Sequence, residues 1–264
     1  MSLGDRPILG RKRYEERSVF TPEALLREAR RQKGVSPANV PAVCLLDPDG
    51  DILAQLRADE SASKDANWAC YHTHLYRVNR GSLEFGVIAS VVGASYAVLV
   101  AEELFASGCR LLISIASAGQ IVPAREPPYF VLIERALRDE GTSYHYLPPS
   151  RFSIMEAALL STLRESLGRH SSILFGTTWT TDAPFRETAA EIDYYRSQGI
   201  LAVEMEASAL YAFAEARRKP VVCIAYVTNN MGTGDRDFEK GHANGASDSL
   251  AVFLEVAMAC LNGA

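Results

Sequence analysis

Residues 199–230 read GILAVEMEASALYAFAEARRKPVVCIAYVTNN, and their pattern predicts a strand, a helix and a second strand in succession. Residues 201–203 are apolar, as at the end of a buried strand. Small and apolar residues then recur at helical spacing, and Lys219-Pro220 ends the predicted helix. Residues 221–227 are apolar and rich in β-branched side chains, as in a buried strand. Such a βαβ unit predicts an α/β protein whose sheet is at least partly parallel.

Two carboxylates, Glu204 and Glu206, stand between the first of these strands and the helix. Ligands of open α/β sheets bind at the carboxyl ends of strands, where a carboxylate can accept the hydroxyl hydrogen bonds of a sugar. Acidic residues at a helix start are also favoured by the helix dipole alone. Both interpretations stay open on these residues.

Composition describes an ordinary globular chain. It has 264 residues, 48% hydrophobic and 22% charged, which is enough for one large domain or two small ones. A net charge of −5 gives no sign of a nucleic-acid or membrane surface. The basic N-terminus lacks a signal-peptide core, and the apolar stretch 87–100 is too short to span a bilayer.

The sequence offers little for a metal or redox site. The five cysteines form no CxxC pair, so we expect buried free thiols in a reducing cytoplasm. The aspartates of Asp47-Pro48-Asp49-Gly50-Asp51 lack the glycine and glutamate of a calcium loop and indicate a polar turn. His72 and His74 lack a third ligand nearby. We therefore predict no metal.

Other segments complete an alternation of helices and strands. Thr21-Pro22 predicts a helix start, with Gly34 at its end. We expect strands over 40–46, 67–78, 85–92, 110–115, 129–133 and 172–177, and helices over 96–107, 155–167, 193–198 and 246–261. The small residues 116–119 predict a loop whose amides can approach an anion, and residues 232–245 a mobile loop.

Two polar segments are candidates for recognition of a base. Phe185 and Arg186 suit stacking on a planar heterocycle and hydrogen bonding to it, although Arg186 can also pair locally with Glu187 or Glu191. Asn229 and Asn230 end the strand 221–227; their amides can contact base edges, or they are ordinary turn residues.

The pattern from Val203 to Tyr211, V-E-M-E-A followed by A-L-Y, resembles the signature of the nucleoside phosphorylase superfamily. That superfamily includes uridine phosphorylases, hexameric purine nucleoside phosphorylases and methylthioadenosine nucleosidases. The resemblance implies that Met205 lies against the ribose and that Glu206 holds its hydroxyls. It also implies that Glu204 lines the base and ribose side of the pocket.

Three further segments extend the resemblance. Gly93-Ala94-Ser95 with the following E-E-L is similar to the family's G-x-P-S helix start, and residues 115–119 are similar to its phosphate- and ribose-binding loop. The T-D-x-x-F run ending at Phe185 looks like the base-binding loop of uridine phosphorylases. From the residues and the resemblance together, we predict Glu206 and Arg186 as catalytic residues. The predicted substrate-binding residues are Ser117, Ala118, Gly119, Phe185, Glu204, Met205, Asn229 and Asn230. The candidate phosphate-binding residues are Gly93, Ser95, Ser117 and His72.

The chain departs from the family at the phosphate site. Three positions that carry arginine in phosphorylases are here the turn Asp47–Gly50, Ser114 and the segment Tyr71–His74. Charge-assisted bonds to phosphate normally depend on such cations. The family's aspartate that protonates purines is absent near Asn229-Asn230, which favours a pyrimidine base.

The resemblance implies one α/β domain over residues 1–264, three-layered α/β/α around a central mixed, partly parallel sheet, with residues 1–20 as an irregular arm. It implies a uridine phosphorylase-like enzyme of nucleotide salvage, cytoplasmic and homo-oligomeric, a dimer or hexamer. Phosphate would be the co-substrate and no cofactor would be needed. Two alternatives stay open: a hydrolytic nucleosidase, with Glu204 or Asp182 activating water, and a non-catalytic nucleoside-binding protein.

Overall fold

The computed structural model describes residues 7–167, 173–231 and 240–263. Its strands are β1 (Val43–Asp47), β2 (Ala62–Lys64), β3 (Tyr76–Arg80), β4 (Leu83–Ala89), β5 (Leu111–Gln120), β6 (Tyr129–Asp139), β7 (Phe152–Ile154), β8 (Ile173–Thr181), β9 (Ala202–Glu204) and β10 (Val221–Asn230). Its helices are α1 (Pro22–Lys33), α2 (Asp51–Ala58), α3 (Ala94–Ala106), α4 (Ala157–Leu167), α5 (Ala189–Ser197), α6 (Ala207–Arg217) and α7 (Ala246–Asn262), with short 3-10 turns η2 (Ser143–His145), η3 (Pro184–Arg186) and η4 (His242–Gly245).

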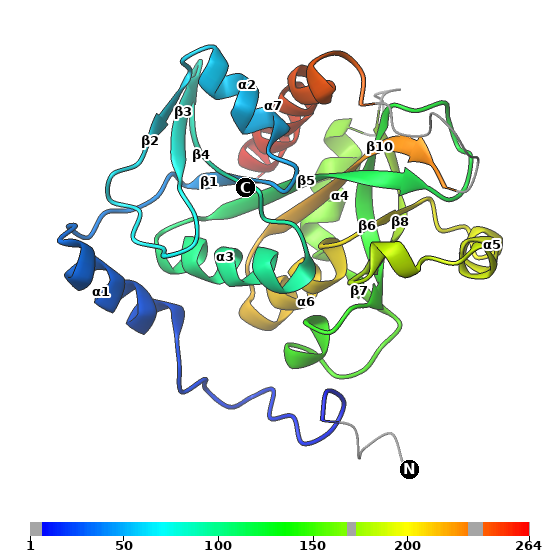
Figure 1. Cartoon of the computed structure of the whole chain (residues 1–264), viewed down its shortest axis with the longest axis horizontal. Coiled ribbons are helices and arrows are strands. Elements are labelled where there is room, and N and C mark those ends of the chain that lie inside the picture. Colours follow the sequence, from blue (N-terminus) through cyan, green and yellow to red (C-terminus); the bar gives the residue numbers. More distant parts are fainter. Residues whose placement is uncertain (1–6, 168–172, 232–239, 264) are drawn as a thin grey trace.

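All strands belong to one mixed sheet of ten strands, in the order β10-β6-β8-β9-β5-β1-β4-β3-β2, with β7 on β6. Because β10 also pairs with β5, five of these strands close into a ring, while β1 to β4 extend it as an open sheet. Helices cover both faces: α3 and α6 pack together on one, and α2, α4 and α7 on the other (Figure 1). The predicted single α/β domain with a partly parallel sheet is confirmed.

The direction of the strands around α6 differs from the predicted βαβ unit. β9 runs antiparallel to β5, whereas β10 runs parallel to β5, so the strands that flank α6 run in opposite directions. The parallel pairs are instead β1 with β4 and β5, β5 with β10, and β8 with β6 and β9. The ring explains the difference, because a strand that closes a ring can return at either orientation.

Several predicted boundaries also need correction. The small residues Ala116–Gly119 lie inside β5, and residues 67–75 precede β3 as loop, so His72 and His74 do not share a strand face. The turn after β1 leads directly into the unpredicted helix α2. The start of α1 is as predicted, because Thr21 accepts a hydrogen bond from Ala24 and Gly34 adopts the left-handed conformation. The arm is irregular over 7–20, and most of the predicted loop 232–245 lies outside the described residues.

The C-terminal helix is a core element. The stretch His242–Asn262 is the one described helical segment long and apolar enough to span a membrane, but half of it is buried inside the protein. Helix α7 packs on α2, α4 and β5, and the ring of Phe253 contacts that of Phe85 on β4 at a tilt of 49°, with ring centroids 4.7 Å apart. Its hydropathy is therefore accounted for by this packing.

Helix α6 is tied to the sheet by one fully buried tyrosine. The hydroxyl of Tyr211 donates to the carbonyl of Ile133 on β6 and accepts the N–H of Cys223 on β10 at 3.0 Å. This side chain is 1% exposed, so water cannot replace either partner. The hydroxyl therefore fixes α6, and the carboxylates at its start, against two strands of the ring.

We expect Tyr211→Phe to lower the free energy of unfolding by about 1–3 kcal/mol, because it leaves a buried N–H and a buried carbonyl without this partner. Urea denaturation followed by circular dichroism measures the change. Tyr194→Phe on α5 is the matched control, because Tyr194 is 54% exposed and its loss should change stability by less than about 0.5 kcal/mol. Equal midpoints for the two variants would refute the anchoring role of Tyr211.

Candidate active site

A buried carboxylate, Glu204, organises the junction between β8, β9 and α6. One of its oxygens accepts from the hydroxyls of Thr178 and Thr180, and the other accepts from the backbone N–H groups of Glu206 and Ala207, both at 2.7 Å. Thr180 also accepts the N–H of Ser208 at 2.9 Å. These contacts satisfy the N–H groups of Glu206, Ala207 and Ser208 at the start of α6. Glu204 has no acceptor site to spare, so in this structure it positions its neighbour Glu206.

Glu206 points instead to the start of another helix. Its carboxylate accepts the N–H of Gly93, which precedes α3, at 2.7 Å. Gly93 has φ +97°, a conformation that side chains disfavour, so a glycine is what allows this N–H to face the carboxylate. Burial, the negative charge of Glu204 and, more weakly, that of Asp49 raise the pKa of Glu206 to about 8. Glu206 is a buried acid, poised to change its protonation near neutral pH.

The residues 115–119 that resemble an anion loop already hold an anion of this chain. Both donors of Ser117 contact Asp49: the backbone N–H at 2.7 Å and the hydroxyl at 2.8 Å, each on a different carboxylate oxygen. Lys240 lies 3.4 Å from Asp49 and 2.6 Å from Asp51. Asp49 and Lys240 are not among the residues predicted from sequence for the site. The one signal in the sequence was an acidic turn after the first strand, where the family carries arginine.

The turn after β1 brings a further acid to the same place. Asp47 is buried and accepts the N–H groups of Gly50 and Leu53 at 3.1 and 2.8 Å. The pKa of Asp47 is raised to about 7, mainly by burial and further by the negative charges of Asp49 and Asp51. The two hydrogen bonds lower it, but by less than burial raises it. The end of β1 is thus a strongly acidic edge of the site.

Sheet pairing brings together three of the predicted segments. Gly119 of β5 is opposite Val203 of β9 and also opposite Asn229 of β10, and Asn230 is opposite Gln120. Residues 117–119 and 229–230 therefore lie on neighbouring strands, and residues 204–206 lie at and directly after the end of β9, which also pairs with β5. Gln120 donates to Asn230 and accepts the hydroxyl of Tyr129 at 2.6 Å, so the amide of Asn230 is held by a buried network.

Among the described residues, no hydrogen bond or ion pair joins Phe185, Arg186 or His72 to this group. Phe185 is fully exposed and Arg186 is exposed in η3. The pKa of Glu191 is lowered mainly by its hydrogen bonds with Thr188 and further by the charge of Arg186, as local pairing predicts. His72 is exposed in the loop before β3, where its carbonyl accepts the hydroxyl of Tyr96 on α3 at 3.1 Å. The roles of these residues toward a substrate stay predictions.

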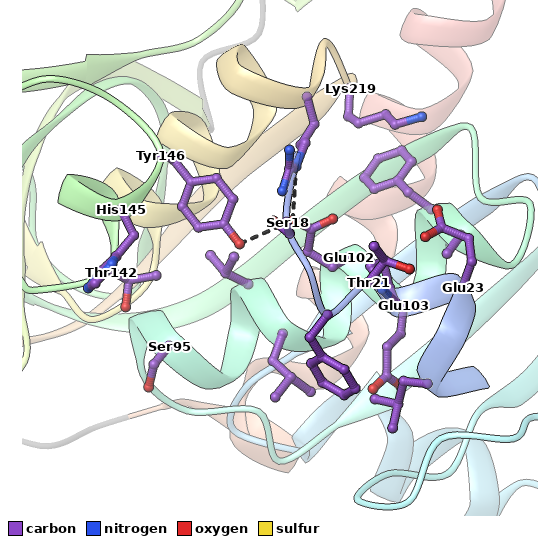
Figure 2. A pocket seen from close by; sticks show the side chains of 18 of the residues that line it. Ser18, Thr21, Glu23, Ser95, Glu102, Glu103, Thr142, His145, Tyr146 and Lys219 are labelled. Carbon is purple, nitrogen blue, oxygen red and sulfur yellow. Dashed lines mark hydrogen bonds and ion pairs between the residues drawn. The ribbon is translucent and has the colours of Figure 1, made fainter. Parts of the chain in front are cut away.

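A cavity of about 750 Å³ lies beside α3 but is not the site around Glu206 (Figure 2). Phe20 of the N-terminal arm, Tyr146 after η2 and Glu102 of α3 line it, and Tyr146 donates to Glu102 at 3.1 Å. Of the predicted site residues, Ser95 alone lines it, at the end nearest the start of α3. We therefore identify the candidate site from the carboxylate contacts and not from this cavity.

The carboxyl and amide groups of the site suit hydrogen bonds to an uncharged polar ligand. Within residues 7–167, 173–231 and 240–263, no three His, Cys, Asp or Glu side chains are grouped to hold a metal ion. The site combines two buried carboxyls, the N–H at the start of α3 and the amides at the end of β10. Carboxylates with neighbouring amides can bind the hydroxyls of a sugar and the edge of a heterocycle.

Comparisons with known proteins find similar sequences and structures among nucleoside phosphorylases. The uridine phosphorylase of Thermococcus kodakarensis is 26% identical over 83% of this chain and 84% of its own. A DeoD-type purine nucleoside phosphorylase of Exiguobacterium sibiricum is 25% identical over 70% of this chain and 83% of its own. An uncharacterized protein of Acanthamoeba polyphaga mimivirus is 27% identical over 68% of this chain and 69% of its own. The crystal structure of the uridine phosphorylase of Vibrio fischeri superimposes with a TM-score of 0.60 at 21% identity, covering 87% of both chains.

A family model also matches most of the chain. Residues 33–258 match the sequence model of the Phosphorylase superfamily, from the end of α1 to within α7. This range includes every residue of the site described above. The chain belongs to the phosphorylase superfamily.

Proposed function

We propose that this protein cleaves the N-glycosidic bond of a nucleoside, transfers the pentosyl group to an acceptor and releases the free base. The observation that carries the proposal is the buried Glu206 carboxyl, bonded to Gly93 and joined through its neighbour Glu204 to β8 and β9. Such a rigid acid is suited to hold sugar hydroxyls in one orientation. The family membership supports the same reaction class.

In the proposed reaction, the sugar lies over Met205 with its hydroxyls on Glu206. The glycosidic bond lengthens towards an oxocarbenium-like sugar, whose positive charge develops beside the acids at the ends of β1 and β9. Negative groups fixed before the reaction stabilise such charge without reorganisation. The base leaves with the bonding electrons, so donors near it, for which we propose Arg186 and the amides of Asn229 and Asn230, stabilise the leaving group.

We further propose a pyrimidine base, because residues 229–230 are amides where purine enzymes of the family carry an acid. The relatives include both uridine and purine nucleoside phosphorylases, so their names support cleavage of a nucleoside and leave the base open. They also make phosphate the first candidate acceptor. Water is the second candidate, and the contact between Asp49 and Ser117 favours it. A homo-oligomer in the cytoplasm stays a prediction.

Release of free base from a panel of nucleosides, with uridine first, tests the proposed function. We expect Glu206→Ala to lower kcat/KM at least roughly tenfold, because the sugar loses a contact that orients it for reaction. Glu215→Ala is the matched control, since Glu215 is exposed near the far end of α6 and should leave turnover unchanged. Equal losses in both variants, or none, would contradict the assignment of Glu206. Binding without base release by the wild type would favour a nucleoside sensor.

Replacement of Arg186 by alanine tests the base-binding prediction. If Arg186 contacts the base, the variant should raise KM for the nucleoside more than it lowers turnover at saturation. The structure places Arg186 on the surface near Glu191, so substrate would have to draw the η3 turn inward. A variant with wild-type kinetics, alongside a raised pKa of Glu191 by NMR, would show that Arg186 is only a local ion-pair partner.

The protonation of Glu206 gives a prediction about stability. The pKa of Glu206 is about 8 in the folded protein and near 4.5 in the unfolded chain. Between these two pH values the unfolded chain loses the proton more readily, so the free energy of unfolding falls as the pH rises from 4.5 to 8. The wild type should lose stability over this range by a few kcal/mol, on the order expected from shifts of this size. Glu206→Gln should flatten that decline, whereas Glu215→Gln should not. Parallel pH profiles for all three proteins in urea denaturation would contradict the raised pKa.

A further inference from the structure

Ser117 and Asp49 form an anion-binding contact that is filled from within the chain. The two donors of Ser117, one from the backbone and one from the side chain, engage both oxygens of one carboxylate at 2.7 and 2.8 Å. Paired donors of this kind bind any small oxyanion, whether carboxylate or phosphate. An external anion could use these donors only by displacing Asp49.

Displacement of Asp49 would face electrostatic opposition. Asp49 lies within 3.4 Å of Lys240, which Asp51 also engages, and Asn244 holds Asp51 at 2.8 Å. Asp47, Asp51 and Glu206 surround the same place, and the charge of Asp49 reaches both Asp47 and Glu206 strongly enough to raise their pKa values. A phosphate ion would add up to two negative charges to this group of acids.

A water molecule meets no such opposition. The Asp49 side chain is 26% exposed, so solvent reaches it. Each oxygen of a carboxylate has about two lone-pair sites, so the contacts to Ser117 leave capacity for a further hydrogen bond. The Ser117 donors also fix the orientation of the carboxylate, which a positioned general base requires.

We propose that Asp49 replaces an anionic co-substrate on Ser117 and serves as the general base that makes water the acceptor of the pentosyl group. This inference rests on the proposed nucleoside cleavage. The water oxygen forms a bond to C1′ as the C1′–N bond breaks, and that electron pair leaves with the base. Asp49 takes a proton from the water and later releases it to solvent, while the base nitrogen takes a proton from solvent. The products are a free pentose and the neutral base.

The first test compares wild-type protein with and without inorganic phosphate, and identifies the sugar product. We expect equal rates of base release, free pentose as the product, and incorporation of ¹⁸O from labelled water at C1. Asp49→Asn keeps the size of the side chain but removes the base, and should lower kcat roughly 100-fold or more. Asp59→Asn, an exposed residue after α2, is the control that should retain full activity. Phosphate-dependent release with pentose 1-phosphate formed would overturn the inference.

A second test needs no turnover. Asp49→Ala leaves the Ser117 donors open, so phosphate should raise the melting temperature of this variant and not that of the wild type. Equal phosphate stabilisation of both proteins would overturn the inference. The two experiments also separate the hypotheses, because failure of every nucleoside to be cleaved rejects the proposed function, whereas cleavage that requires phosphate rejects only the role of Asp49.

Discussion

The buried carboxylate of Glu204 is the constraint on which the site depends. A charged group without partners would be costly in this interior, but four hydrogen bonds from Thr178, Thr180 and two backbone N–H groups compensate for its burial. These bonds join β8, β9 and the first turn of α6, and they leave Glu206 with one direction, towards the start of α3. Each of the two interpretations left open by the sequence therefore applies to one acid of the V-E-M-E segment. Glu204 accepts the N–H groups at a helix start, and Glu206 faces the candidate site.

Local chemistry made much of the fold predictable. The cap at Thr21, the apolar run of β10 and the helical spacing of α3 each depend on neighbouring residues, so the sequence contains their cause. Strand direction does not. The opposed directions of β9 and β10 follow from the closure of the ring by β5, a contact between residues about a hundred positions apart. For the same reason residues 116–119, which have the composition of a loop, are strand: they pair with β10 along one edge, and Gly119 also pairs with β9.

The sequence predicted site residues that follow one another along the chain. It did not predict contacts between site residues that are far apart in the chain. Residues 204–206 could be located because strand, acids and helix are consecutive. The partnership of Asp49 with Ser117 spans 68 positions, and no local pattern announces it. The acidic turn after β1 differs from the arginine-containing turn of the family, and the sequence shows this difference. Only the structure shows that Asp49 of this turn accepts both hydrogen bonds of Ser117.

This pairing changes the balance of charge in the site. An enzyme that binds phosphate beside a sugar needs cations to offset it, and those cations then oppose the positive charge that develops on the sugar. Here Lys240 is shared by Asp49 and Asp51, while Asp47 and Glu206 lie within electrostatic range. In the proposed reaction, the carboxylates of Asp49 and Asp51 favour positive charge on the sugar and oppose a charged nucleophile. Under the proposed function, the absence of the arginines and the presence of Asp49 belong together, because both favour water over phosphate as the acceptor.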